Sequence, residues 1–320
     1  MMGETHSVLG RFLASKGRNG EAVDAFRRAV DSFGTLLRTH HSTPAYTECL
    51  NGALFGLSGS LASGDQTGEA VDVYRRATEL MSVPARGFDE PAEAPSAGSW
   101  PPPCMMRALG PLSRSLRTAG KVADAERVER QSLAALDALA VGYVGRPAYL
   151  GKLAECYLSL GNVLAGAGDG QGARAAWRKA LERNPENTSA LNNLAWQAAT
   201  CPDPVIRNPR RAVELAKKAV ELAPKVATHW NTLGVAHYRA GDWKAAVDAL
   251  TRSMELGHGG DGNDWFFLAM AQWQLGDKPQ ARSWYDKAAP WVEKNQPGNE
   301  ELTRFRAEAA DLLEVNGTKP

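Results

Sequence analysis

Excess charge of one sign is missing from this sequence. Its 37 lysines and arginines are balanced by 36 aspartates and glutamates, which gives a net charge of +1 over 320 residues. A protein that binds nucleic acid or an anionic membrane surface gathers a basic patch, and this composition has no excess from which to build one. We therefore expect neither nucleic acid nor a membrane among its partners.

Cysteine pairs and long apolar runs are missing too. Cys49, Cys104, Cys156 and Cys201 are spread along the chain without a CxxC pair, which favours free thiols in a reducing compartment. The N-terminus, MMGETHSVLGRF, lacks the apolar run of a signal peptide. No stretch approaches the roughly 18 apolar residues of a membrane span. The sequence therefore predicts a cytoplasmic protein.

Motifs for catalysis and metal binding are also missing. The glycine-rich segment GAGDGQGAR at 166–174 lacks the Lys-Ser/Thr pair of a phosphate-binding loop, and no strand precedes it. His6, His229, His237 and His258 have no partner at zinc-ligand spacing. The HRD and DFG motifs of a protein kinase do not occur. We expect no enzyme activity, no cofactor and no metal site.

What the sequence does contain is one set of spacings, repeated along its length. A leucine followed by a small residue occurs at seven places, for example Leu160-Gly161 and Leu233-Gly234. In most repeats a glycine comes seven residues after the small residue, and an alanine comes twelve residues after it. A second small residue follows seven residues after that alanine. Between the alanine and the second small residue stands a bulky residue, which is Phe26, Tyr74, Trp177, Leu250 or Tyr285; the exception is Glu129.

These spacings are those of two packed helices. The leucine and the small residue share one helical stripe, and the glycine supplies the left-handed residue that ends the first helix. Asp169, Asp242 and Asp277 follow that glycine and can cap the second helix. Small residues at fixed points let the two helices approach closely. Because one pair cannot bury its apolar face alone, neighbouring pairs must stack.

The pattern resembles the tetratricopeptide repeat. Residues 154–187 match best, and residues 227–260 come next. The matching residues of the first segment are Tyr157, Leu160, Gly161, Gly168, Ala173, Ala180 and Pro185. The resemblance implies an all-α superhelical solenoid of about seven antiparallel helix pairs with a C-terminal capping helix. A second resemblance is to the C-terminal repeat regions of bacterial multi-domain signalling proteins, some of which carry a Ser/Thr kinase domain. The sequence segment that carries it runs from LNNLAWQAATCPDP to NPRRAVELAKKAVELAP.

Composition also predicts boundaries. Residues 82–103 are rich in Pro, Gly and Ala, and they indicate a linker or long loop. It would separate an N-terminal block of two long helix pairs, 1–81, from a C-terminal block of about five pairs, 104–298. The amphipathic segment 299–315 is the predicted capping helix. The three prolines of CPDPVIRNP at 201–209 lengthen the turn of one repeat.

The first helices of the last four pairs supply the expected peptide-binding groove. In a stack of helix pairs they line the concave face, and one helical stripe points into it. Its candidates are Asn162, Asn192, Asn193, Trp196, Asn231, Tyr238, Phe266, Met270 and Trp273. Amides can pair with an extended peptide backbone, and aromatic rings can anchor side chains. For the aromatic residues, packing against neighbouring helices is an equal alternative.

One kind of ligand can be excluded from the sequence. Asn162 and Asn193 match the two asparagines of repeat proteins that grip the acidic C-termini of heat-shock chaperones. Leu158, Ser189 and Thr232 stand where those proteins have basic residues, and a carboxylate would lack its charge-assisted partners there. The sequence thus predicts a non-catalytic scaffold that binds another peptide or protein segment in its groove. The alternative is a regulatory or docking region of a Ser/Thr kinase-type signalling protein.

Overall fold

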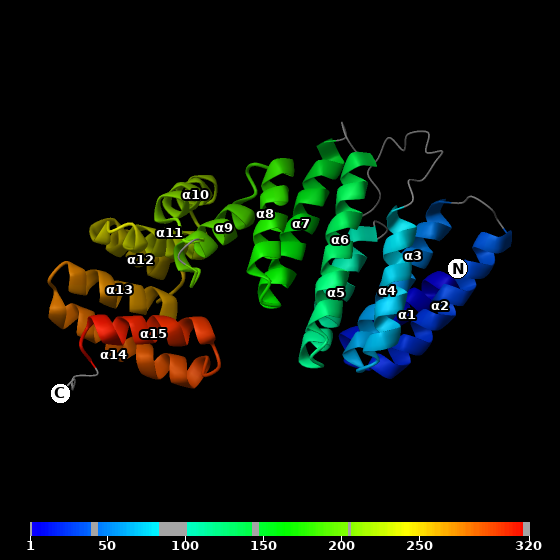
Figure 1. The fold of residues 1–320 in the computed structure, drawn as a ribbon, viewed down its shortest axis with the longest axis horizontal. Helices are drawn as coiled ribbons and strands as arrows, with labels where there is room; N and C mark the ends of the chain where they lie inside the picture. Colours follow the sequence, from blue (N-terminus) through cyan, green and yellow to red (C-terminus); the bar gives the residue numbers. More distant parts are fainter. Residues whose placement is uncertain (1, 40–43, 83–100, 143–146, 204–205, 316–320) are drawn as a thin grey trace. The chain divides into compact units, whose positions relative to one another are not determined.

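The fold consists of helices throughout. The computed structural model describes residues 2–39, 44–82, 101–142, 147–203 and 206–315. These residues form fifteen α-helices and no strand (Figure 1). The predicted all-α architecture of antiparallel helix pairs is therefore confirmed. The chain divides into two compact units, Met1–Pro185 and Glu186–Pro320.

Unit 1 contains four helix pairs. They are α1 (Met2–Ser15) with α2 (Asn19–Thr39), α3 (Pro44–Ser63) with α4 (Thr67–Ser82), α5 (Pro101–Thr118) with α6 (Val122–Gly142), and α7 (Pro147–Gly166) with α8 (Gly170–Arg183). The two helices of each pair pack against each other, and the first helices of successive pairs also touch. The core therefore continues from one pair to the next, as the repeat pattern requires.

Unit 2 contains three shorter pairs and a final helix. They are α9 (Thr188–Thr200) with α10 (Pro209–Leu222), α11 (Ala227–Arg239) with α12 (Trp243–Leu256), α13 (Gly262–Gln274) with α14 (Lys278–Asn295), and then α15 (Glu300–Leu312). Helix α15 lies against α13 and α14 (Figure 1). One continuous cluster of buried apolar side chains extends from α9 to the residue after α15.

The turns inside the pairs have the predicted geometry. The glycine at this turn has φ between 73° and 91° in five pairs; these residues are Gly17, Gly120, Gly168, Gly241 and Gly276. Glycine adopts this left-handed conformation without steric cost. Asp169, Asp242 and Asp277 then cap α8, α12 and α14, each accepting a hydrogen bond from a backbone N–H in the first turn.

The small residues lie where two helices come closest. A Cβ added to Gly161 would lie 2.4 Å from the ring of Trp177, and one added to Gly234 would lie 2.5 Å from Leu250. The alanine twelve residues after each small residue has no exposed surface; these residues are Ala22, Ala70, Ala125, Ala173, Ala246 and Ala281. The spacings therefore describe packing inside a helix pair.

The predicted linker falls largely outside the described residues, which omit 83–100. The helices before and after it lie in the same compact unit: α3 packs against α5, and α4 against α6. The division between the two units falls between residues 185 and 186. A boundary at 82–103 stays a prediction.

Candidate functional site

Helix α15 contacts α9 near the C-terminal end of that helix. Trp196 of α9 donates its indole N–H to both carboxylate oxygens of Glu301, at 3.2 and 3.3 Å. Arg304 donates to the backbone carbonyl oxygen of Thr200 at 2.9 Å. These contacts join residues that are more than one hundred positions apart in the sequence. Helix α15 therefore reaches back past α13 to the first pair of its unit.

The strongest polar contact of α15 is made with α11. Both terminal nitrogens of Arg239 donate to the carboxylate of Glu308, and the Nη2–Oε2 distance is 2.7 Å. The guanidinium also lies over the rings of Tyr238 and Phe267, at 5.5 and 5.1 Å from their centroids. A two-point guanidinium–carboxylate pair is directional and strong, particularly where it is partly buried. It fixes the position of α15 along its axis.

An aromatic contact lies between these two polar contacts. Phe305 of α15 is fully buried. Its ring packs edge-on against Phe267, at 4.9 Å between centroids, and against Trp196, at 6.1 Å. We call the surface formed by Trp196, Thr200, Tyr238, Arg239 and Phe267 the α15-binding face; it combines apolar rings with two donors for carboxylates.

The α15-binding face contains two of the predicted groove residues, Trp196 and Tyr238. Burial, followed by the charge of Glu308, raises the pKa of Tyr238 to about 12. Its phenol therefore stays protonated at neutral pH. Tyr238 also packs edge-on against Phe267, with 5.4 Å between ring centroids.

Three other predicted residues serve the packing of unit 2. Phe266 and Met270 have no exposed surface and belong to the apolar core. Asn231 donates from Nδ2 to Oδ1 of Asp264 at 2.8 Å. Asp264 is itself buried and, with Asp261, forms the capping box of α13. Burial raises the pKa of Asp264, so the hydrogen bond from Asn231 offsets part of the cost of its charge.

The remaining predicted residues are more accessible. Asn162 is exposed and accepts a hydrogen bond from Trp177 Nε1 at 3.1 Å. Asn192, Asn193 and Trp273 are half-buried. The Oδ1 atom of Asn192 is buried and has no hydrogen-bond partner among the described residues. Lys278 and Arg282 lie over the ring of Trp273, at 4.7 and 5.8 Å from its centroid.

The eight predicted residues of unit 2 therefore divide between the α15-binding face, the apolar core and more accessible positions, and the sequence analysis did not predict several residues of the contact with α15. Arg239, Phe267, Glu301 and Glu308 were absent from the predicted set. The spacing of Glu301, Phe305 and Glu308, at i, i+4 and i+7 on one helical face, was a signal that this tail carries more than a solvating role.

Unit 1 has an open cavity of its own, with a volume of about 530 Å³. It lies between the end of α3, the start of α4 and the C-terminal half of α5. Its lining combines four hydroxyls, two charges and several small apolar groups. The lining residues are Ala62, Ser63, Asp65, Thr67, Pro111, Arg114, Ser115, Thr118 and Ala119.

Asp65 stands out among the residues that line this cavity. It occupies the turn position at which five other pairs have glycine, and its φ is 61°. An L-residue in this conformation is strained, although Asp tolerates it better than most. Asp65 lines the cavity together with the exposed Arg114.

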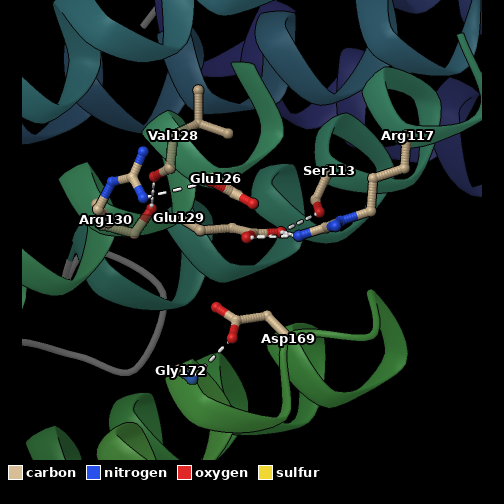
Figure 2. A network of polar contacts seen from close by, with 9 residues as sticks. Ser113, Arg117, Glu126, Val128, Glu129, Arg130, Asp169 and Gly172 are labelled. Atoms are coloured by element: carbon tan, nitrogen blue, oxygen red, sulfur yellow. Dashed lines mark hydrogen bonds and ion pairs between the residues drawn. The ribbon is translucent and has the colours of Figure 1, made fainter. Parts of the chain in front are cut away.

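A buried charged cluster lies between α5 and α6 (Figure 2). Glu129, the exception in the repeat pattern, is almost fully buried. Its carboxylate accepts from Arg117 Nη2, with Oε2 at 2.9 Å and Oε1 at 3.2 Å, and from the hydroxyl of Ser113. Ser113 takes the place of the small residue and Glu129 that of the bulky one. A polar contact therefore replaces the usual packing contact within this pair.

The described part of the chain contains no cluster of three metal-binding side chains. None of its helices combines the length and the apolar character that crossing a membrane demands.

Known repeat families match parts of the chain from residue 158 of α7 onward. Residues 158–200 and 206–257 match one tetratricopeptide repeat model, and residues 265–287 match another. These segments are tetratricopeptide repeats. The resemblance inferred from the spacings is thereby confirmed for α9–α14 and for much of α7–α8. Nothing in the matches points to a kinase-associated protein. Tetratricopeptide repeats generally serve as scaffolds for protein interactions.

Two solved structures of similar fold are described as tetratricopeptide repeat proteins. A tetratricopeptide repeat protein from Parabacteroides merdae ATCC 43184 has 12% sequence identity and a TM-score of 0.46; the match covers 98% of this chain and 99% of that chain. YrrB, a TPR protein with an unusual peptide-binding site, has 14% identity and a TM-score of 0.40, over 71% and 93% of the two chains. No curated protein matches the sequence.

Proposed function

We propose that this chain is a non-catalytic scaffold that binds a segment of a partner protein on the first helices of its repeats. The observation that carries this proposal is the docking of α15. Unit 2 holds a helix through side-chain contacts from α9, α11 and α13. The first helices therefore have a surface that suits a polypeptide segment.

The proposal also includes the accessible residues of the predicted groove, each within its own unit. Asn162 and Trp273 lie on first helices, α7 and α13, and retain exposed atoms. We assign them, with Asn192 and Asn193, to direct contact with a partner. Trp196 and Tyr238 shape the α15-binding face, while Asn231, Phe266 and Met270 support it from within.

Site-specific photo-cross-linking tests this assignment. We would place a benzoylphenylalanine at Asn162 or Trp273 and expose the chain to extract from its native host. Matched controls place the same group at Arg178 of α8 or Lys218 of α10, which are exposed on second helices. We expect discrete cross-linked products from the first-helix positions only. Products from the second-helix positions alone would move the binding surface to the opposite helices.

The compartment and the alternative role also remain proposals. Balanced charge and the absence of a CxxC pair from the sequence support the cytoplasm as the site of action. The role as a docking region of a kinase-type protein has no structural observation in its favour. We also retain the exclusions of nucleic acid, membranes and chaperone C-termini as ligands, on the basis of charge and the missing basic residues.

A further inference from the structure

We propose that the α15-binding face recognises an amphipathic helix with the pattern Glu-x3-Phe-x2-Glu, and that α15 is the chain's own copy of that ligand. The partner is thus a protein that presents this pattern on a helix and competes with α15. This inference rests on the proposed function and names its partner class.

The two polar contacts define the spacing that the face recognises. Glu301 and Glu308 are seven residues apart, which corresponds to roughly 10.5 Å along a helix at 1.5 Å per residue. Trp196 and Arg239 receive these two carboxylates from different helices of unit 2. An extended strand would place the same residues about 23 Å apart. A ligand whose carboxylates are seven residues apart can therefore engage both donors only when it is helical.

The aromatic contact defines the residue between the carboxylates. Phe305 lies four residues after Glu301, on the same side of the helix. It is fully buried against Phe267 and Trp196. A helix with the two carboxylates and no aromatic side chain would leave these rings uncovered. The pattern is therefore specific in both charge and shape.

The polar contacts are open enough for a second helix to approach. The side chains of Glu301 and Glu308 are 39% and 34% exposed, although Phe305 beside them is buried. An incoming carboxylate can reach the edge of the site and replace one glutamate before α15 leaves as a whole. Arg239, in contrast, is held by Tyr238 and Phe267 and stays in place.

A labelled peptide tests the exchange. The probe is a fluorescent synthetic peptide of residues 298–315, titrated against the full chain with anisotropy as the readout. Glu301→Gln with Glu308→Gln weakens the contacts of the resident helix. We expect this variant to bind the probe at least tenfold more tightly than the parent. Adding Arg239→Gln should remove the gain.

The matched control changes the same number of charges on the same helix. Glu300→Gln with Asp311→Asn alters two exposed acidic residues of α15. This control should bind the probe as weakly as the parent does. The proposal is overturned if the two double variants bind equally, or if Arg239→Gln leaves probe affinity unchanged. Circular dichroism confirms that each variant is folded.

Hydrogen exchange on the parent chain gives a second test that does not depend on any variant. An excess of probe peptide, labelled with ¹³C and ¹⁵N, should accelerate amide exchange in residues 300–312. Exchange in α13 should not change, because the probe takes the place of α15. Unchanged exchange in α15 at saturating peptide would overturn the proposal.

The two proposals fail in different ways. If the probe does not bind but cross-links form at Asn162 and Trp273, the scaffold function stands and only the helical pattern is wrong. If the probe binds but no first-helix cross-link forms, the α15-binding face is an internal contact without an external partner.

Discussion

The pair α5–α6 of unit 1 and the pairs of unit 2 share one backbone arrangement but differ in the side chains that fill the contact between their two helices. In unit 1 the contact between α5 and α6 is a buried charge cluster, and the Tyr74 hydroxyl bonds to Ser132 at 2.6 Å. In unit 2 the equivalent places hold Leu250 and Tyr285, within an aromatic core. The turn glycines and the buried alanines are common to both. The small residues therefore determine how closely the two helices of a pair approach each other. The bulky side chains that meet at this distance can form either a polar or an apolar contact.

The ends of the two units differ as well. In unit 2, α15 covers the last pair and buries Leu302, Phe305 and Leu313. In unit 1, the first helix α1 presents a row of exposed apolar side chains; these are Met2, Val8, Leu9 and Phe12. Apolar residues on a terminal helix therefore contribute to stability only where a neighbouring helix covers them.

The largest expected effect tests this difference between the ends. Phe305→Ala should destabilise unit 2 by about 3–5 kcal/mol, because it removes a fully buried ring from the core. Phe12→Ala in α1, where the ring is 56% exposed, should change stability by less than about 0.5 kcal/mol. Urea denaturation followed by circular dichroism measures both. Equal losses would mean that α1 is as tightly packed as α15.

The second prediction compares the polar contact between α5 and α6 with the apolar contacts of unit 2. Glu129→Gln should cost roughly 2–4 kcal/mol, because it leaves the partly buried Arg117 without its charge partner. The triple change Glu129→Leu, Arg117→Leu and Ser113→Ala should recover most of that loss, since it installs the apolar contact used in unit 2. Thermal denaturation of both variants provides the measurement. A triple variant less stable than the single one would show that the polar cluster is required.

A smaller effect is expected at the close approach of α7 and α8. Gly161→Ala should destabilise by about 1–3 kcal/mol, because its Cβ would meet the Trp177 ring at 2.4 Å. Gly151→Ala, in the same helix but with no atom within 4 Å of the new Cβ, should stabilise by roughly 0.5–1 kcal/mol. Melting temperatures should therefore move in opposite directions.

The smallest effect should be seen when the pH is varied, and it concerns two histidines of unit 2. Burial lowers the pKa of both His229 and His237 from the ordinary value of 6.5. Below that value the unfolded chain binds more protons than the folded one, so stability is full above pH 6.5 and declines as the pH falls. The melting temperature should drop on acidification. His229→Gln with His237→Gln should flatten this dependence, and an unchanged slope would assign it to other groups.

The sequence alone was enough to predict the helix pairs but not the arrangement of the site. Leu160, Gly161, Gly168 and Ala173 act through contacts within one pair, so their spacing carries the geometry directly. The contact of Arg239 with Glu308 joins residues 69 positions apart. Its existence depends on how three pairs and α15 stack.

The predicted groove residues show the same limit. Phe266 and Met270 occupy the predicted stripe of α13 but are fully buried. A stripe of residues shows on which side of their helix the side chains lie. It does not show whether another helix covers that side. The role of the acidic residues of α15 became visible only in the structure, which shows that they accept hydrogen bonds from Trp196 and Arg239.

The short connection between α14 and α15, residues 296–299, has a consequence for competition. A short tether holds a ligand at an effective concentration on the order of millimolar. A free helix at micromolar concentration thus begins at a thousandfold disadvantage, equivalent to about 4 kcal/mol. A successful competitor must make additional contacts outside the α15-binding face or be delivered at high local concentration. The tether therefore prevents helices that bind weakly, or that are present at low concentration, from displacing α15.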